Sequence, residues 1–280
     1  MKFIKPKKSL GQNFLKSSLA LRKIIEAGEI KKGDVILEIG PGKGKLTEKL
    51  LEKSGKVIAI EKDRELYLYL QDKFKNEIAS RSLVLVREDI LKFDLRKVIL
   101  GFSNGLGIVS EDLKKTSKSL EYKIIANIPY NITGAILKKF LTEAIQPEKM
   151  ILMVQKEVAK RIVAHEGGES ILSISVKAYG TPSMIMKVPS RYFSPAPKVD
   201  SAVIAIKDIS RRNFVENEVN EEKFWEIVKL GFAHKRKKLS SNLKSLKYIE
   251  KNLLENLENK RAEELSLDEW INLTKASSKS

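Results

Sequence analysis

The chain has 280 residues, 42% of them hydrophobic, which is enough for one sizeable core or two modest ones. Its formal net charge of +17 favours a polyanionic partner, although a Lys-rich solvated surface would give the same excess. The absence of cysteine excludes disulfides and thiolate chemistry, and two histidines are too few for a histidine-based metal site, so we expect no metal.

The first ten residues are basic and lack the apolar segment of a signal peptide. No apolar stretch of the sequence is long enough to cross a bilayer. These features predict a cytoplasmic protein without a membrane partner, and we expect it to act as a monomer.

The N-terminal segment carries seven Lys or Arg residues before its first acid, Glu26. Residues 11–15 read Gly-Gln-Asn-Phe-Leu, and the amphipathic stretch 19–27 predicts a helix. The chain therefore opens with a basic arm that leads into a helix.

Strands and helices alternate from residue 34 to residue 206. Short apolar runs predict strands at 34–39, 56–60, 82–86, 123–126, 150–154 and 201–206. Amphipathic stretches predict helices at 46–51, 67–78, 133–144 and 155–164, whereas 171–179 fits either a helix or a strand. This alternation predicts an α/β fold with a mostly parallel, twisted sheet.

Two regions depart from the alternation. Residues 95–121 contain several Gly, Ser and Asn residues and predict a turn-rich excursion. After residue 207 the apolar positions follow helical spacing only. We therefore expect an α/β domain with its basic arm at 1–207 and a small all-α domain at 208–280.

A glycine-rich turn follows the first predicted strand, where residues 38–44 read Glu-Ile-Gly-Pro-Gly-Lys-Gly. Glycine at Gly40 and Gly42 would let the backbone approach a ligand closely. No Gly-Lys-Ser/Thr ending follows, so the turn is not a cradle for a triphosphate. By itself the turn also fits a generic nucleotide site or tight strand–helix packing.

Acids close the next two predicted strands. Glu61 stands where a carboxylate accepts both ribose hydroxyls, and Asp89 would then accept from an adenine amine. Each acid alone fits a helix N-cap equally well, but the pair behind the glycine turn favours an adenosine-containing cofactor. On fold grounds alone a dehydrogenase remains possible.

Asn127-Ile128-Pro129-Tyr130 follows the fourth strand and resembles the Asn/Asp-Pro-Pro-Tyr/Phe signature of amino-group methyltransferases. The side-chain oxygen of Asn127 and a carbonyl near Ile128 or Pro129 would grip the N–H groups of an adenine amine. Pro129 would fix the direction of that carbonyl, and Tyr130 would stack on the base. An Asn-X-Pro turn that merely ends a strand is the alternative, and the preceding cofactor motifs favour the catalytic reading.

A stacked base must be flipped out or unpaired to reach such a site. Phe193, in a proline-stiffened loop, is the best candidate for a second wall that would sandwich the base against Tyr130. The alternative is a core aromatic residue beneath that loop.

Taken together, these motifs resemble the ribosomal RNA small-subunit adenine dimethyltransferase family, the kasugamycin-resistance dimethyladenosine transferases. The resemblance runs from Lys8 to about Leu243. It rests on the order and spacing of motifs at 11–15, 38–42, 127–130, 155–159 (Gln-Lys-Glu-Val-Ala), 193–201 (Phe-Ser-Pro-Ala-Pro-Lys-Val-Asp-Ser) and the basic stretch 232–243.

The resemblance implies a Rossmann-like class I methyltransferase fold, the cofactor S-adenosyl-L-methionine and N6,N6-dimethylation of two adjacent adenosines. These adenosines lie in the 3'-terminal hairpin loop of small-subunit (16S-type) rRNA, so the implied partner is an immature small ribosomal subunit. The family's cofactor contacts fall on Asn13, Leu15, Gly40, Glu61, Asp89 and Asn127, and Gly42 belongs to the same turn.

Lys235, Arg236, Lys237 and Lys238 belong to a basic run without an intervening acid. Together with Lys7 and Lys8 of the arm they are predicted to contact RNA phosphates, although a solvated face would look similar. Two other functions remain open. One is a large-subunit rRNA adenine methylase of the erythromycin-resistance type, and the other is a non-catalytic RNA-binding assembly or transcription factor on the same scaffold.

Overall fold

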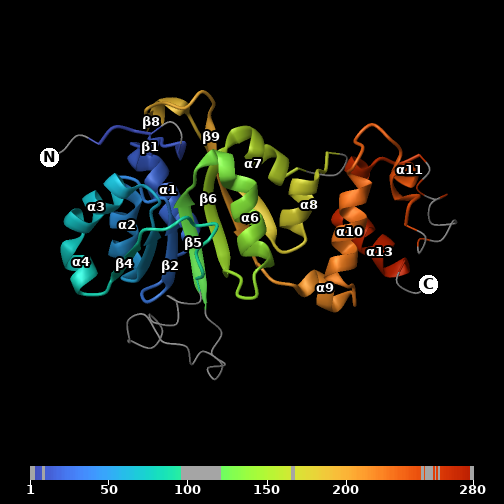
Figure 1. Cartoon of the computed structure of the whole chain (residues 1–280), viewed down its shortest axis with the longest axis horizontal. Helices are drawn as coiled ribbons and strands as arrows, with labels where there is room; N and C mark the ends of the chain where they lie inside the picture. Colours follow the sequence, from blue (N-terminus) through green and yellow to red (C-terminus); the bar gives the residue numbers. More distant parts are fainter. Residues whose placement is uncertain are drawn as a thin grey trace, which may run out of the picture. The chain divides into compact units, whose positions relative to one another are not determined.

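The computed structural model describes residues 4–7, 10–95, 121–164, 168–246, 249, 255, 257 and 259–277. It forms two compact units, Met1–Lys156 with Ser183–Lys207 and Glu157–Pro182 with Asp208–Ser280 (Figure 1). The first unit is α/β and the second is helical, which confirms the predicted fold class. Except for its two end residues, the excursion predicted at 95–121 lies outside the described residues.

The α/β unit contains a seven-stranded sheet in the order β4-β3-β2-β5-β6-β9-β7 and a two-stranded sheet, β1-β8. Its elements are β1 (Phe14–Leu15), α1 (Ser18–Gly28), β2 (Val35–Ile39), α2 (Lys45–Ser54), β3 (Val57–Ile60), α3 (Arg64–Lys73), α4 (Lys75–Ala79), β4 (Leu83–Val86), β5 (Tyr122–Asn127), η2 (Tyr130–Ile132), α6 (Thr133–Thr142), β6 (Lys149–Gln155), β7 (Thr181–Val188), η3 (Ser190–Tyr192), β8 (Phe193–Ser194) and β9 (Ser201–Lys207).

Five neighbouring strands, β4 to β6 in the sheet order, run parallel, and β9 runs antiparallel to β6. All six predicted strands are present. A seventh strand, β7, lies at the edge of the sheet and is not predicted by the apolar pattern. Pro182 near its start weakens the strand pattern, and proline is tolerated at an edge because it cannot donate to a neighbouring strand.

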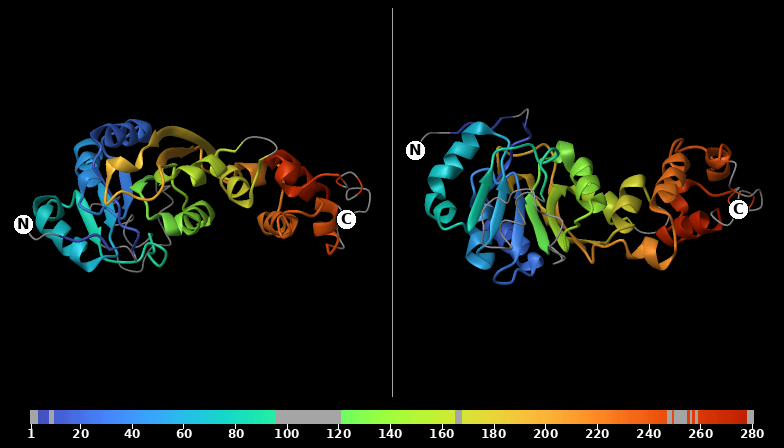
Figure 2. Two further views of the ribbon diagram at one scale, coloured as in Figure 1. Left: turned by 90° about the horizontal axis from the view of Figure 1, so that it is seen from above. Right: turned by 60° about the horizontal axis from the view of Figure 1, so that its bottom comes forward.

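The central strands are mostly apolar and almost completely buried, because helices cover both faces of the sheet. Every residue of β2 and β3 is buried, as are all but the last residues of β5 and β6. From β2 the chain moves toward β3 and β4, whereas from β5 it moves the other way to β6. Right-handed crossovers therefore put α2 and α6 on opposite faces (Figure 2).

The helical unit contains α7 (Lys156–Ile162), α8 (Ile171–Lys177), α9 (Arg212–Glu216), α10 (Glu221–Gly231), α11 (Leu239–Leu243), η4 (Ala262–Glu264) and α13 (Leu267–Ala276). Its core is close-packed between α10 and α13. A Cβ atom at Gly231 would lie 2.4 Å from Cη2 of Trp270, whose side chain is fully buried. In the described part of the chain, no helix combines the length and apolarity needed to cross a membrane.

The predicted boundary at 207/208 needs one correction, because Glu157–Pro182 belongs to the helical unit and not to the α/β unit. Tyr179 shows the reason. Its hydroxyl accepts a hydrogen bond from Nε1 of Trp225 at 3.0 Å and also contacts Glu221, and its carbonyl accepts from the backbone of Ser210 at 2.8 Å. These partners are distant in sequence, so composition alone could not reveal them.

Two buried lysines, one in β5 and one in β6, form ion pairs near the start of these strands. Nζ of Lys149 lies 2.6 Å from the carboxylate of Glu29, which also contacts Nζ of Lys207 at 2.5 Å. Nζ of Lys123 pairs with Asp34 at 2.6 Å. The hydrogen bond from Lys149 and that from Lys207 lower the pKa of Glu29 from 4.5 to about 2.

This network predicts an acid-sensitive contribution to stability. Since the folded pKa of Glu29 lies below the unfolded value, its contribution is fully present above about pH 4.5 and is lost as the pH falls through about 2. We expect Glu29→Gln to lower the free energy of unfolding at pH 7, and the deficit to shrink between pH 4.5 and pH 2. Urea unfolding across this pH range measures the deficit.

Glu52→Gln, at an exposed pair with Lys49 on α2, is the matched control and should change stability little. A deficit of Glu29→Gln that stayed constant down to pH 2 would contradict the assignment.

Candidate functional site

A cavity of about 440 Å³ opens at the carboxyl ends of β2, β3 and β5. At β2 the order of the sheet reverses, because β3 follows on one side and β5 joins on the other. This reversal is the position at which open α/β sheets bind ligands. The volume falls within the range of small-molecule sites.

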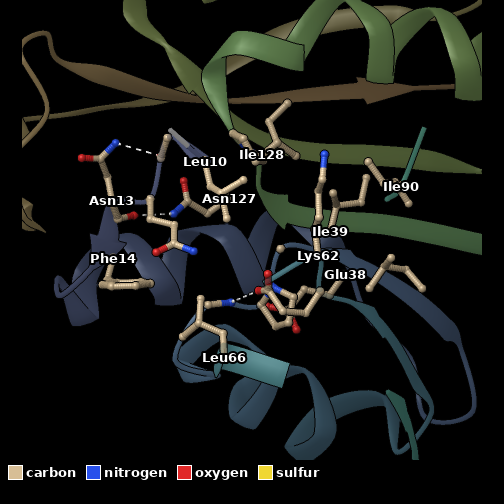
Figure 3. A pocket seen from close by; sticks show the side chains of 18 of the residues that line it. Leu10, Asn13, Phe14, Glu38, Ile39, Lys62, Leu66, Ile90, Asn127 and Ile128 are labelled. Atoms are coloured by element: carbon tan, nitrogen blue, oxygen red, sulfur yellow. Dashed lines mark hydrogen bonds between the residues drawn. The ribbon is translucent and has the colours of Figure 1, made fainter. Parts of the chain in front are cut away.

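The cavity brings together ten of the residues that the sequence analysis assigned to the cofactor site and the catalytic turn. They are Asn13, Leu15, Gly40, Gly42, Glu61, Asp89, Asn127, Ile128, Pro129 and Tyr130. Segments far apart in the sequence thus meet at one site (Figure 3).

The glycine turn lies directly beside the turn at 127–130. Gly40 and Gly42 adopt positive φ angles of 66° and 59°. A Cβ atom at Gly40 would lie 3.9 Å from Cδ of Pro129, and one at Gly42 would lie 3.1 Å from Cδ1 of Phe14. Both positions therefore favour glycine for their backbone conformation, and at Gly42 the ring of Phe14 also leaves little room for a side chain.

Two buried carboxyl groups line the cavity, Glu38 and Glu61, with exposures of 1% and 6%. Glu61 accepts hydrogen bonds from the backbone N–H groups of Asp63 and Gly42 at 2.8 and 3.3 Å, and burial raises its pKa. Since Asp63 and not Glu61 caps α3, the helix-cap alternative for Glu61 does not hold.

Glu38 is a residue to which the sequence analysis gave no role of its own. Its carboxyl group accepts from Oγ1 of Thr47 at 2.6 Å. Burial, together with the nearby charge of Glu61, raises the pKa of Glu38 to about 8. In the sequence, Glu38 is a single acid inside an otherwise apolar strand. Because burial of a carboxyl group is costly, such a position indicates a functional or hydrogen-bonding role.

Asp89 lines the cavity and is partly exposed. Nζ of Lys62 contacts its carboxylate at 2.8 Å, and the backbone of Leu91 donates at 3.0 Å. The hydrogen bond from Lys62 lowers the pKa of Asp89, so its carboxylate is charged and can accept a further hydrogen bond.

Asn127 is the last residue of β5, and its amide is oriented by the N-terminal arm. Its Nδ2 atom donates to the carbonyl of Asn13 at 3.3 Å, the contact drawn as a dashed line in Figure 3. The amide nitrogen is thereby engaged, and Oδ1 is the atom that can accept a hydrogen bond from a ligand.

Tyr130 begins η2 and is anchored at its far end. Its hydroxyl lies 2.5 Å from Oγ of Ser201, the first residue of β9, whose side chain is fully buried. Oγ1 of Thr133 donates to the carbonyl of Tyr130 at 3.1 Å. Burial raises the pKa of Tyr130, which therefore keeps its proton at neutral pH.

Phe193 does not line the cavity. Its side chain is 2% exposed and belongs to the hydrophobic core, and its backbone pairs with Leu15 across β1 and β8. The next residue, Ser194, lines the cavity instead. Phe193 thus occupies the core position that the sequence left open as the alternative.

Lys7 also lies in an environment that the sequence analysis did not foresee. Its Nζ atom pairs with the carboxylate of Asp63 at 2.8 Å and lies 3.3 Å from that of Glu65. The predicted phosphate contact of Lys7 stays a prediction beside this internal ion pair. Lys8 lies outside the described residues.

The predicted basic run is located in the helical unit, between α10 and α11. Lys235, Arg236, Lys237 and Lys238 are all exposed. Within the described ranges, from residue 4 to residue 277 with their gaps, no three His, Asp or Glu side chains gather as a metal site.

The sequence is similar to proteins of a known family. A model of the family described as "Ribosomal RNA adenine dimethylase" matches residues 4–279. "Ribosomal RNA small subunit methyltransferase A" of Dehalococcoides mccartyi (strain CBDB1) is 39% identical, over 96% of this chain and 88% of that protein. The protein of the same name from Fusobacterium nucleatum is 38% identical, over 97% of both chains.

Two solved structures extend the comparison. A dimethyladenosine transferase from Plasmodium falciparum has a TM-score of 0.73 at 26% identity and covers 93% of this chain and 95% of its own. The 23S rRNA methyltransferase ErmE has a TM-score of 0.68 at 21% identity, covering 95% and 100%. The latter likeness shows a shared fold.

The pairing of Tyr130 with Ser201 predicts non-additive stability effects. Tyr130→Phe and Ser201→Ala each remove one hydroxyl and leave the other without its partner, so each should cost about 1 kcal/mol of the free energy of unfolding. The double variant should cost less than the sum by about 0.5–1.5 kcal/mol, as measured by urea unfolding.

Tyr122→Phe serves as the control, because its hydroxyl donates to the carbonyl of Ile145 and not to Ser201. Combined with Ser201→Ala it should be additive. Additivity in the Tyr130 cycle as well would show that the two hydroxyls are not coupled.

Proposed function

The chain belongs to the ribosomal RNA adenine dimethylase family, and we propose on this premise that it transfers methyl groups from S-adenosyl-L-methionine to small-subunit rRNA. Its products would be N6,N6-dimethyladenosines at two adjacent positions of the 3'-terminal hairpin loop. The observation that carries the proposal is that Asn127 and Tyr130 line the same cavity as the glycine turn and Glu61.

The cavity suits the proposed cofactor in chemistry as well as in volume. Glu61 would accept the two ribose hydroxyls, and Asp89 would accept the adenine amine. Gly40 and Gly42 leave backbone space for the cofactor, with Asn13 and Leu15 as the wall contributed by the arm. When bound, S-adenosyl-L-methionine supplies a methyl group made electrophilic by its sulfonium.

The turn at 127–130 would prepare the amine of the substrate. The lone pair of an adenine amine is delocalised into the ring, which makes the amine a poor nucleophile. Oδ1 of Asn127 and a carbonyl of Ile128 or Pro129 would accept its two N–H groups and favour a pyramidal nitrogen. Alignment and fixed dipoles then provide most of the acceleration, and no strong base is required because the nitrogen becomes acidic only after methylation.

Tyr130 would hold the base itself. A flipped adenine that stacks on its ring gains about 1–3 kcal/mol. The hydrogen bond between its hydroxyl and Ser201 keeps the ring in one orientation. Since Phe193 is buried, this proposal gives it a packing role and leaves Tyr130 as the aromatic contact of the base.

The small subunit is favoured over the large subunit by the relatives that share most of the sequence. Proteins named "Ribosomal RNA small subunit methyltransferase A" are 36–39% identical over nearly the whole chain. The ErmE structure, at 21% identity, supports only the fold. Preferential methylation of large-subunit particles would reverse this choice.

The partner that we propose is an immature small ribosomal subunit, met by a monomer in the cytoplasm. The exposed run at 235–238 would contact its phosphates and so position the RNA without reading its sequence. The net charge of +17 supports an electrostatic encounter with such a polyanion.

The catalytic assignment predicts the effect of removing the acceptor. Asn127→Ala should reduce transfer of labelled methyl groups to undermethylated small subunits by about 100-fold or more, because it removes the side-chain oxygen proposed to accept from the substrate amine. RNA affinity, measured by filter binding, should not change. Asn76→Ala, an exposed residue of α4, is the matched control and should retain full activity.

Identification of the modified nucleoside as N6,N6-dimethyladenosine in wild-type reactions completes the test. RNA binding without any methyl transfer by the wild-type protein would instead favour the non-catalytic assembly or transcription factor.

The RNA assignment predicts a charge-specific loss of affinity. Lys235→Glu combined with Lys237→Glu should weaken rRNA binding by about tenfold or more at 0.1 M salt and reduce the salt dependence. Cofactor affinity, measured by calorimetry, should stay unchanged. Lys32→Glu with Lys53→Glu changes the charge equally in the α/β unit, near the start of β2, and should weaken binding much less. Equal losses in both pairs would contradict a specific contact.

A further inference from the structure

The N-terminal arm, defined here as residues 4–7 and 10–16, supplies a wall of the cavity. Residues 10–16 all line it. The arm is held at two places, one near α3 and one near the turn at 127–130. Side-chain and backbone contacts hold the arm at both places.

The first attachment converges on Asp63. Its two carboxylate oxygens accept from Nζ of Lys7 and from Nε2 of Gln12, each at 2.8 Å. The side-chain oxygen of Gln12 accepts in turn from the backbone N–H of Lys7, also at 2.8 Å. Two arm residues are thus bound to each other and to one carboxylate.

Asp63 is a rigid anchor for these contacts. Its side chain is fully buried, and it caps α3 by accepting from the backbone of Glu65 at 2.9 Å. Its own N–H donates to Glu61, the residue proposed to hold the ribose. Burial alone would raise the pKa of Asp63, but Lys7 and the other donors lower it, so the carboxylate is charged.

The second attachment ends beside the catalytic turn. The carbonyl of Asn13 accepts a hydrogen bond from Nδ2 of Asn127, and β1 pairs with β8. The N–H of Lys16 donates to the carbonyl of Tyr192 at 2.7 Å. The carbonyl that orients Asn127 therefore belongs to the same short arm that Asp63 fastens at its other end.

We propose that Lys7 is a positioning residue, whose ion pair with Asp63 fastens the arm as a wall of the cofactor site and keeps the carbonyl of Asn13 against Asn127. This inference rests on the proposed S-adenosyl-L-methionine site. It assigns Lys7 to the binding of cofactor, whereas its basic character in the sequence pointed to RNA. Loss of the ion pair loosens this wall and weakens the binding of cofactor, whereas the affinity for RNA does not change.

The test compares Lys7→Met with Lys5→Met. Both variants remove one positive charge from the arm, but Lys5 is exposed and no ion pair to it is seen within the described chain. Calorimetric titration with S-adenosyl-L-methionine should give a Kd about fivefold higher for Lys7→Met and nearly unchanged for Lys5→Met. Lys7→Arg should retain most of the affinity, since it keeps the charge.

Two further measurements separate positioning from general destabilisation. Hydrogen–deuterium exchange of the N-terminal peptide without cofactor should be faster in Lys7→Met than in Lys5→Met, while the melting temperatures stay close. Asp63→Asn keeps an acceptor for Glu65 but removes the negative charge, and it should reproduce the cofactor defect.

The outcomes distinguish this inference from the function on which it rests. Equal cofactor affinity and equal exchange in the two lysine variants would overturn the role of Lys7, as would a loss of rRNA affinity confined to Lys7→Met. Failure of the wild-type protein to bind S-adenosyl-L-methionine would overturn the proposed function, while faster exchange in Lys7→Met would still support the fastening of the arm.

Discussion

The site depends on the parallel pairing of β2 with β5. These strands lie side by side although a long stretch of chain separates them, and residues 35–37 pair in register with residues 122–124. Because parallel strands end at the same edge, the glycine turn after β2 and the turn after β5 meet there. The 3.9 Å from a Cβ at Gly40 to Pro129 measures how closely they meet. The proximity of the cofactor turn to the catalytic turn follows from this pairing.

Much of this arrangement could be predicted from local sequence. Buried strands such as β2 and β5 are short apolar runs, and the acids and amides that line the cavity stand directly after them. The topology of parallel crossovers then gathers strand ends without knowledge of any side-chain contact. For this reason Gly40, Glu61, Asp89 and Asn127 were correctly expected to lie together.

The remainder could not be predicted because it depends on partners remote in sequence. Lys7 looks like any other basic residue of the arm until Asp63 is placed beside it. The sequence around Phe193 suggests a stacking residue, but the pairing of β1 with β8 directs its side chain into the core. Likewise, Tyr179 draws Glu157–Pro182 into the helical unit through contacts with Trp225 and Ser210. The local sequence pattern predicts the helix or strand to which each of these residues belongs, whereas its contacts in the folded protein determine its role.

The contact between Gly42 and Phe14 limits how this sequence can diverge. A methyl group at position 42 would meet the ring of Phe14 at 3.1 Å, on a backbone that already disfavours any side chain. A residue larger than glycine at position 42 would therefore need a smaller residue at position 14, and its backbone would still be strained. We expect the two positions to covary among homologues, so that substitutions tolerated in one lineage would be harmful when moved singly into another.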